Sequence, residues 1–269
     1  MDEIHYLEYE GRKIPYRIEL ADRYRRLSVI MGEDGNLVIR APRRAGIAMI
    51  HGTARKNAAQ FAEIYDRGRR SLSDPEAEGM RKTVTGEDGV ERVLLGFECV
   101  DGASLPYGGR NISLHVMMQP GFKKPCITAK DGALYVELPA ENEEQEQKLL
   151  ESGIVPALVE AWYKKQAERV LPGLAAKEAE HMGVTFGRVT IRNQKTRWGS
   201  CSADGNLNFN VRIMLMPSYV VRYVVIHELC HRKHMDHSPE FWSMVETYDP
   251  DYREAVRFLN EKATYYRLR

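Results

Sequence analysis

The sequence predicts an α+β fold with two domains: a β-rich accessory domain with one helix over residues 1–145, and a helix-rich domain with a small antiparallel sheet over residues 146–269. Short alternating apolar runs separated by Gly- and Asp-containing turns predominate in the first half, and this pattern is typical of strands. Apolar residues at helical spacing predominate in the second half, which predicts helices. A histidine-rich helix near residue 227 places the chemistry in the second domain.

The first domain begins with two predicted hairpins. Residues 4–20 alternate weakly around Gly11, and residues 27–40 form apolar runs on either side of a turn at 33–36. Residues 45–69 carry apolar positions at helical spacing. We therefore expect one helix that packs on this sheet.

Three further segments complete the first domain. The polar residues 69–91 predict an exposed loop. Residues 97–138 contain apolar runs between Gly-containing turns and predict further strand pairs. The acidic run at 141–147 predicts a solvated linker or the start of a helix, and it joins the two domains.

The second domain begins with a long predicted helix. Ser152 has the character of an N-cap, Gly183 that of a stop signal, and Pro172 can kink or divide the helix between them. We expect this helix to pack behind the histidine-rich helix. The remaining predicted elements are a strand over 184–193, a hairpin formed by 198–202 and 207–211, the histidine-rich helix that begins near Pro217, and two helices after Pro239.

The main chemical signal lies between Val224 and Trp242, where His227 and His231 flank Glu228 with the spacing H-E-x-x-H. Residues four apart share one face of a helix, so both imidazoles can bind one zinc ion. Glu228 is placed to reach a metal-activated water and act as the general base. Apolar residues precede the motif and predict a buried helix, where an ionisable cluster needs a metal or another partner.

His237 is the favoured third ligand, because a catalytic site takes three protein ligands and keeps one position open for water. It follows His231 by six residues, which is roughly 9 Å along a continued helix. The helix must therefore stop after His231 and the chain must turn back. Asp236 tolerates a left-handed turn, and Ser238-Pro239 has the pattern of an N-cap followed by a first helical position.

Other third ligands are less suitable. His234 lies seven residues from His227, roughly 10 Å along a straight helix, which is too far for a shared metal. Glu246 and Glu254 on the following helix remain alternatives, by analogy with zincins that use two histidines and a glutamate. Cys201 and Cys230 are not needed if three histidines bind the metal.

Residues around the motif resemble one known family. Arg192–Ser202 contains R-W-G-S-C, and after it come an Asp-Gly turn, two asparagines, Pro217, H-E-L-C-H and H-S-P-E-F-W. This order is similar to that of the YgjP-like metallopeptidases, relatives of the SprT-like and Wss1-like zincins, strongly over residues 150–269 and more loosely over 20–145. The resemblance implies a zincin-like fold and a zinc-dependent protease, with His227, His231 and His237 as ligands and Glu228 as base.

Zincins typically bind an extended substrate along the edge of a sheet beside the metal helix. Candidates for substrate binding near such an edge are Arg192, Lys195, Arg197, Asn208 and Asn210. The basic residues could instead form a solvated strand face, and the asparagines could satisfy backbone groups at a strand end. Tyr248 is a candidate to stabilise the oxyanion, and packing is the alternative role for it.

The overall composition is that of a soluble globular protein, with 43% hydrophobic and 29% charged residues and a net charge of +1. No apolar run approaches the roughly 20 residues that cross a bilayer, so we expect no membrane partner. The acidic start lacks the features of a signal peptide, and the four cysteines show no C-x-x-C spacing. These features favour a cytoplasmic protein in a reducing compartment.

Charge is unevenly distributed along the chain. Residues 12–70 contain fourteen Lys and Arg against six Asp and Glu, whereas residues 71–150 contain eight against fourteen. A basic first region attracts phosphates or an acidic protein, although it is also compatible with a solvated surface. An alternative function is therefore a nucleic-acid-associated zinc protein that acts on or near DNA-bound proteins.

Overall fold

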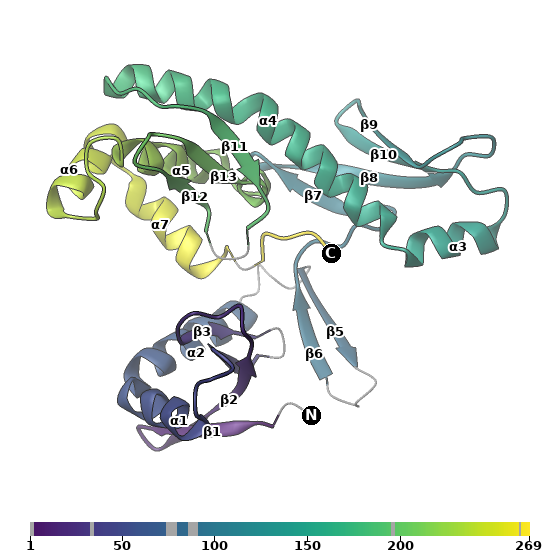
Figure 1. Ribbon diagram of the computed structural model, residues 1–269. Helices are drawn as coiled ribbons and strands as arrows, with labels where there is room; N and C mark the ends of the chain where they lie inside the picture. The colour runs from purple at the N-terminus through teal and green to yellow at the C-terminus, as the bar shows by residue number, and fades with distance from the viewer. Residues whose placement is uncertain (1–2, 33–34, 74–79, 86–90, 195–196, 264) are drawn as a thin grey trace. The chain divides into compact units, whose positions relative to one another are not determined.

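The computed structural model describes residues 3–32, 35–73, 80–85, 91–194, 197–263 and 265–269 (Figure 1). The chain forms an α+β structure with two compact units, Met1–Leu95 and Gly96–Arg269. The expected boundary at 145/146 falls inside the second unit, within the helix formed by Glu143–Glu151. A functional division at that point stays a prediction.

The first unit is built on a four-stranded sheet in the order β1-β2-β4-β3. Its strands are β1 (His5–Tyr9), β2 (Arg12–Leu20), β3 (Ser28–Met31) and β4 (Leu37–Ala41). Both predicted hairpins are confirmed, because β1 pairs antiparallel with β2 and β3 pairs antiparallel with β4. The parallel pairing of β2 with β4 joins the two hairpins into one sheet.

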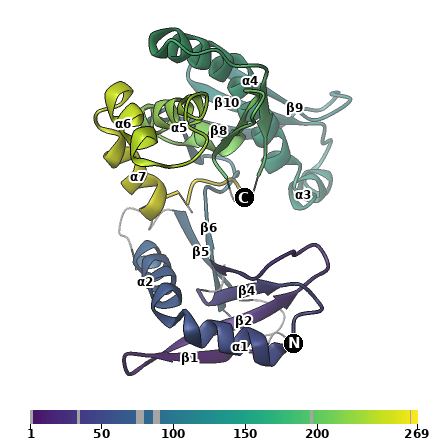
Figure 2. The same ribbon diagram turned by 60° about the vertical axis from the view of Figure 1, so that its left-hand side comes forward.

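Two helices, α1 (Ile47–Lys56) and α2 (Ala58–Ser73), replace the single helix expected over 45–69. Asn57 lies between them as the C-cap of α1. Both helices pack against the sheet (Figure 2), and their apolar residues, including Ile50 and Phe61, share a core with Ile14, Leu37 and Ile39.

The loop expected over 69–91 is only partly correct. Helix α2 continues to Ser73, and β5 (Arg81–Thr85) pairs antiparallel with β6 (Glu91–Leu95). Residues 74–79 and 86–90 of the expected loop lie outside the described residues. The polarity of this segment predicted a loop. The run Thr83-Val84-Thr85, however, consists of β-branched residues, which favour extended structure.

The second unit begins with a four-stranded sheet in the order β7-β8-β10-β9, which confirms the strand pairs expected over 97–138. Its strands are β7 (Ser104–Tyr107), β8 (Arg110–Met118), β9 (Cys126–Lys130) and β10 (Ala133–Leu138). Leu105, Leu114 and Leu134 from this sheet pack in one core with Val159 and Tyr163 of the following long helix. The shared core explains why this sheet belongs to the second unit.

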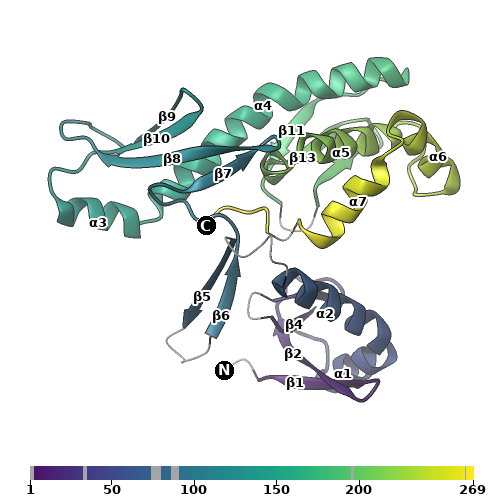
Figure 3. The same cartoon turned by 180° about the vertical axis from the view of Figure 1, so that it is seen from behind.

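Helices α3 (Glu143–Glu151) and α4 (Ile154–Met182) follow this sheet (Figure 3). The expectation that Ser152 caps the long helix is wrong. Ser152 is the C-cap of α3, and Gly153 with φ 74° precedes α4, because the turn between the two helices needs a left-handed residue. Pro172 lies inside an undivided α4, and the helix ends at left-handed Gly183 as predicted.

A small sheet and three helices complete the second unit. Its strands, in the order β11-β13-β12, are β11 (Val189–Arg192), β12 (Gly199–Cys201) and β13 (Leu207–Asn210). The prediction of an antiparallel sheet holds for β12 and β13 but is wrong for β11, which pairs parallel with β13. The chain crosses from β11 to the far side of β13 before it turns back. The strand expected over 184–193 begins only at Val189.

After β13 come a 3-10 turn η2 (Val211–Leu215) and the helices α5 (Ser218–Cys230), α6 (Pro239–Tyr248) and α7 (Tyr252–Glu261). Helix α5 packs on α4, on β12 and on both later helices, so the expected backing helix is confirmed. Buried Glu178 of α4 binds Arg222 of α5 at 2.9 Å and ties these two helices together. In the described part of the chain, no helix combines the length and the apolar character that crossing a membrane requires.

Candidate metal centre

The chain reverses direction directly after α5. His231 is the C-cap of this helix, and α6 begins eight residues later at Pro239. Ser238 caps α6 by accepting a hydrogen bond from the N–H of Phe241 at 3.4 Å, and Asp236 accepts one from the N–H of Ser238 at 3.4 Å. The predicted helix stop and the predicted cap are both confirmed.

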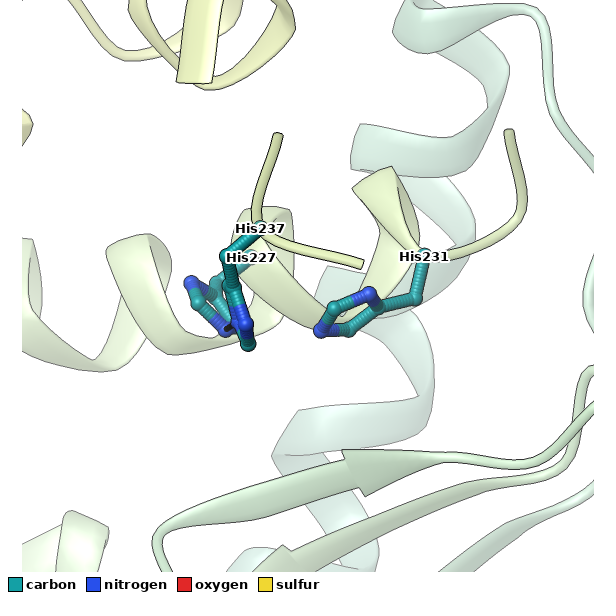
Figure 4. A group of neighbouring side chains, drawn as sticks. All are labelled: His227, His231 and His237. Carbon is teal, nitrogen blue, oxygen red and sulfur yellow. Dashed lines mark hydrogen bonds between the residues drawn. The ribbon is translucent and has the colours of Figure 1, made fainter. Parts of the chain in front are cut away.

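This reversal brings His227, His231 and His237 together (Figure 4). Each ring offers a nitrogen within 4.8 Å of the other two, and the Nε2 atoms of His227 and His237 lie 3.1 Å apart. His227 and His231 are partly buried, whereas His237 is exposed. These three imidazoles form a group that could hold a metal ion. His234, Glu246 and Glu254 are not members of this group.

Two hydrogen bonds orient the rings of the group. The Nδ1 atom of His231 lies 2.9 Å from the backbone oxygen of His234, and the Nδ1 atom of His227 lies 3.2 Å from the hydroxyl of Tyr223. Both contacts leave Nε2 as the ligand atom. Tyr223 was not among the residues predicted from the sequence, although its position four residues before His227 puts it on the same helical face.

Aromatic rings pack around the histidines. Phe241 is fully buried, and its ring centroid lies 4.7–4.9 Å from those of His227, His231 and His237. Burial lowers the pKa of His227 to about 3, with smaller contributions from the two neighbouring imidazoles, and burial also lowers the pKa of His231. Both rings are therefore neutral near pH 7, which is the form that binds a metal.

Glu228 lies on the buried side of α5, where its relative exposure is 5%. Burial raises its pKa to about 8, although the charge of Arg197 and a hydrogen bond from the backbone of Cys201 oppose the shift. Strand β12 approaches this carboxylate closely, because a Cβ atom at Gly199 would lie 2.5 Å from its Oε1. Any larger residue at this position would require the Glu228 side chain or β12 to move.

The candidates for substrate binding lie in different surroundings. Arg197 is exposed and close enough to Glu228 to affect its pKa, Arg192 is exposed on β11, and Lys195 lies outside the described residues. Asn208 is partly buried on β13, 3.4 Å from the hydroxyl of Ser200. These positions place Arg197 near the candidate base and leave the roles of the others as predictions.

Asn210 is only 1% exposed, and its side chain forms three hydrogen bonds within the chain. The side-chain N–H groups donate to the backbone oxygens of Gln194 and Arg197 at 2.6 and 2.8 Å, and the side-chain oxygen accepts from the N–H of Arg212 at 3.1 Å. These bonds join the loop before β12 to the start of η2. The described contacts therefore match the role of satisfying backbone groups at a strand end.

Tyr248 lies elsewhere. Its hydroxyl is 3.5 Å from the backbone oxygen of Met182, and its ring packs edge-on against His181. Among the described residues, the tyrosine that contacts the histidine group is Tyr223. Tyr248 was predicted from its spacing along α6. The sequence does not reveal which face of this helix points toward the histidines.

A family model of the YgjP-like metallopeptidase domain matches residues 92–262. This range covers more than half of the 269 residues and contains the whole histidine group together with Glu228 and β12. The chain belongs to the YgjP-like family. The resemblance stated from the sequence motifs is thereby confirmed, and membership of a metallopeptidase family indicates a hydrolase that acts on protein or peptide.

Among solved structures, the chain is similar to the metallopeptidase zymogen abylysin of Pyrococcus abyssi. The two sequences are 24% identical over 35% of this chain and 95% of that chain, with a TM-score of 0.32. A likeness at this TM-score establishes no shared fold. The comparison of this sequence with curated proteins found no match.

Proposed function

We propose that this YgjP-like protein is a zinc-dependent metalloprotease with a zincin-like catalytic unit, in which His227, His231 and His237 are the ligands. The convergence of three ring nitrogens beside a buried carboxylate carries the proposal. Two nitrogens of a tetrahedral zinc site lie roughly 3.3 Å apart when each Zn–N bond is about 2.0–2.1 Å. The 3.1 Å between the Nε2 atoms of His227 and His237 is close to that value.

A bound zinc ion would supply a Lewis acid that activates water and polarises the scissile carbonyl. Glu228 is the general base in this proposal. Its carboxylate accepts the proton of the attacking water and then delivers it to the leaving amine nitrogen. Burial supports the role, because it raises the pKa of Glu228 to about 8, and a carboxyl with a pKa near neutral pH can both accept and release a proton.

Strand β12 is the proposed binding edge for the peptide substrate. It is an outer strand of its sheet, it packs against α5, and it lies next to Glu228. The oxygen of Trp198 accepts from the N–H of Asn210 at 2.8 Å, and the N–H of Ser202 donates to the oxygen of Asn206, just before β13, at 2.9 Å. Alternation in an antiparallel pair then directs the backbone groups of Gly199 and Cys201 away from β13. The backbone N–H of Cys201 already donates to Glu228, so the groups of Gly199 and the oxygen of Cys201 are the ones offered to a peptide. An extended peptide could add a strand there.

Side chains around this edge complete the proposal. Arg197 is positioned to interact with substrate near Glu228, and Asn210 holds the backbone of Arg197 in place. Arg192, Lys195 and Asn208 stay predicted substrate contacts. Tyr248 ends α6 with its hydroxyl against Met182 of α4, and this position does not support its predicted role at the oxyanion.

Two measurements on the full chain test the proposal. Metal analysis should find about one zinc ion per chain, and a chelator should remove both the ion and the hydrolysis of an unfolded protein substrate. The variant Glu228→Gln should keep its zinc and lose hydrolysis by at least about 100-fold. Full hydrolysis after complete zinc removal, or wild-type turnover in Glu228→Gln, would refute the mechanism.

A further inference from the structure

Arginines gather at one edge of the sheet in the first unit. Strands β2 and β4 are parallel, so their C-terminal ends meet at this edge, where Ala21 N–H donates to Ala41 oxygen at 3.2 Å. The loops that follow these strands therefore lie next to each other. Together with the end of β4 they carry six arginines, here called the arginine edge: Arg23, Arg25, Arg26, Arg40, Arg43 and Arg44.

The acids near the arginine edge neutralise only part of its charge. Glu19 accepts from Arg23 at 2.8 Å and from Arg40 at 3.0 Å, and Asp22 lies 3.7 Å from Arg43. Residues 19–28 and 40–46 contain six arginines, no lysine and these two acids, which leaves a formal charge of +4.

Three of the arginines are available to a ligand. Arg25, Arg26 and Arg44 are exposed, and no described residue forms an ion pair with any of them. Arg23 and Arg40 pair with Glu19 and lie over the ring of Tyr24 at 4.9 and 5.8 Å. The edge thus combines arginines that contact neighbouring side chains with three exposed guanidinium groups that form no ion pair with a described residue.

Helix α1 adds to the positive potential. It begins directly after the loop that carries Arg43 and Arg44, its N-cap Gly46 offers no side chain, and its first turn contains no acid. The first N–H groups of the helix and the positive end of its dipole therefore lie beside the arginines. This helix end adds to the positive potential that the arginines create.

We propose that the arginine edge binds the phosphodiester backbone of nucleic acid without sequence preference. Guanidinium groups bind phosphate oxygens through paired hydrogen bonds, and arginine suits this geometry better than lysine. A membrane surface would need a larger apolar area, and the first turn of α1 exposes only Ile47 and Met49 as large apolar side chains. The inference does not depend on the metal site, and it gives the nucleic-acid alternative a defined surface.

Binding of the full chain to a labelled single strand and to its duplex, at about 50 mM and about 200 mM salt, tests the proposal by fluorescence anisotropy. The test variant is Arg25→Gln/Arg26→Gln/Arg44→Gln, which changes exposed side chains without described ion pairs. Wild type should bind at the lower salt. The variant should lose affinity by about tenfold or more, and the magnitude of its salt slope should fall by roughly 2 to 3, because each phosphate contact contributes about 0.7 to 0.9.

The matched control is Lys123→Gln/Lys124→Gln/Lys165→Gln, which removes the same charge from exposed lysines of the second unit. It should retain wild-type binding within about twofold. Equal losses in both triple variants would overturn the proposal, since only net charge would then matter. Absence of binding by wild type at the lower salt would also overturn it, as would binding confined to phosphatidylserine vesicles. Unfolding curves that match wild type exclude a folding defect as the cause.

Discussion

Gly199 and Glu228 lie so close that a single added carbon at the glycine would stand 2.5 Å from the carboxylate. Gly199 belongs to the edge strand β12 and Glu228 to helix α5, and the two are 29 positions apart in the chain. This contact joins the proposed substrate edge to the proposed base. The short distance also explains why a residue without a side chain, Gly199, stands in the R-W-G-S-C motif.

Gly199→Ala should reduce hydrolysis on the order of 100-fold, because the methyl group must displace the Glu228 carboxylate or move β12. Zinc content should be unchanged, since the three histidines are not touched. Gly173→Ala in α4 is the control, because a Cβ there meets nothing within 4 Å and a helical alanine is favoured. Wild-type turnover in Gly199→Ala would show that the contact has no catalytic consequence.

His237→Ala should lose most of its zinc affinity, whereas His234→Ala should keep it. The reason is that His237 presents a ring nitrogen to the group, while His234 contributes its backbone oxygen, which alanine retains. Zinc content after dialysis against a weak chelator measures the difference. If His234→Ala loses zinc as completely as His237→Ala, the ligand assignment fails.

Tyr223→Phe should weaken zinc binding by about 10-fold or more, because the hydroxyl that orients His227 is removed. Tyr248→Phe is the matched comparison, since its hydroxyl contacts the backbone of Met182 outside the histidine group. We expect that second variant to keep both zinc affinity and turnover. Competition with a chromophoric chelator gives the affinities. A large loss of turnover with normal zinc in Tyr248→Phe would restore the predicted oxyanion role.

The metal-free protein should lose stability as pH rises from about 6.5 to 8. Glu228 has a folded-state pKa of about 8 against 4.5 in a model peptide, so the folded state binds more protons than the unfolded state in this window. Its contribution to the free energy of unfolding should fall by roughly 2 kcal/mol. His227 adds little here, because its lowered pKa costs stability only as pH falls below 6.5.

Urea unfolding of chelator-treated protein at the two pH values measures this slope. Glu228→Gln cannot ionise at that position, so its stability should change less over the same range. The same slope in wild type and Glu228→Gln would assign the dependence to another group. Added zinc should reduce the slope in wild type, because a nearby cation favours the ionised carboxylate.

Local signals in the sequence were sufficient to predict that His227, His231 and His237 come together. His227 and His231 are four residues apart, and Ser238-Pro239 marks the next helix start, so the grouping followed from spacing within a few turns of chain. The same holds for both hairpins of the first unit and for the stop at Gly183.

Tertiary structure decided what depends on residues distant in the chain. The parallel pairing of β11 with β13, the proximity of Gly199 to Glu228 and the placement of Tyr223 rather than Tyr248 beside the histidines all require helices and strands to pack in one arrangement. The raised pKa of Glu228 has the same origin, because burial by other elements determines how much water reaches its carboxylate. Short-range spacing determines which side chains share a helix face, but only packing of the whole unit determines what that face meets.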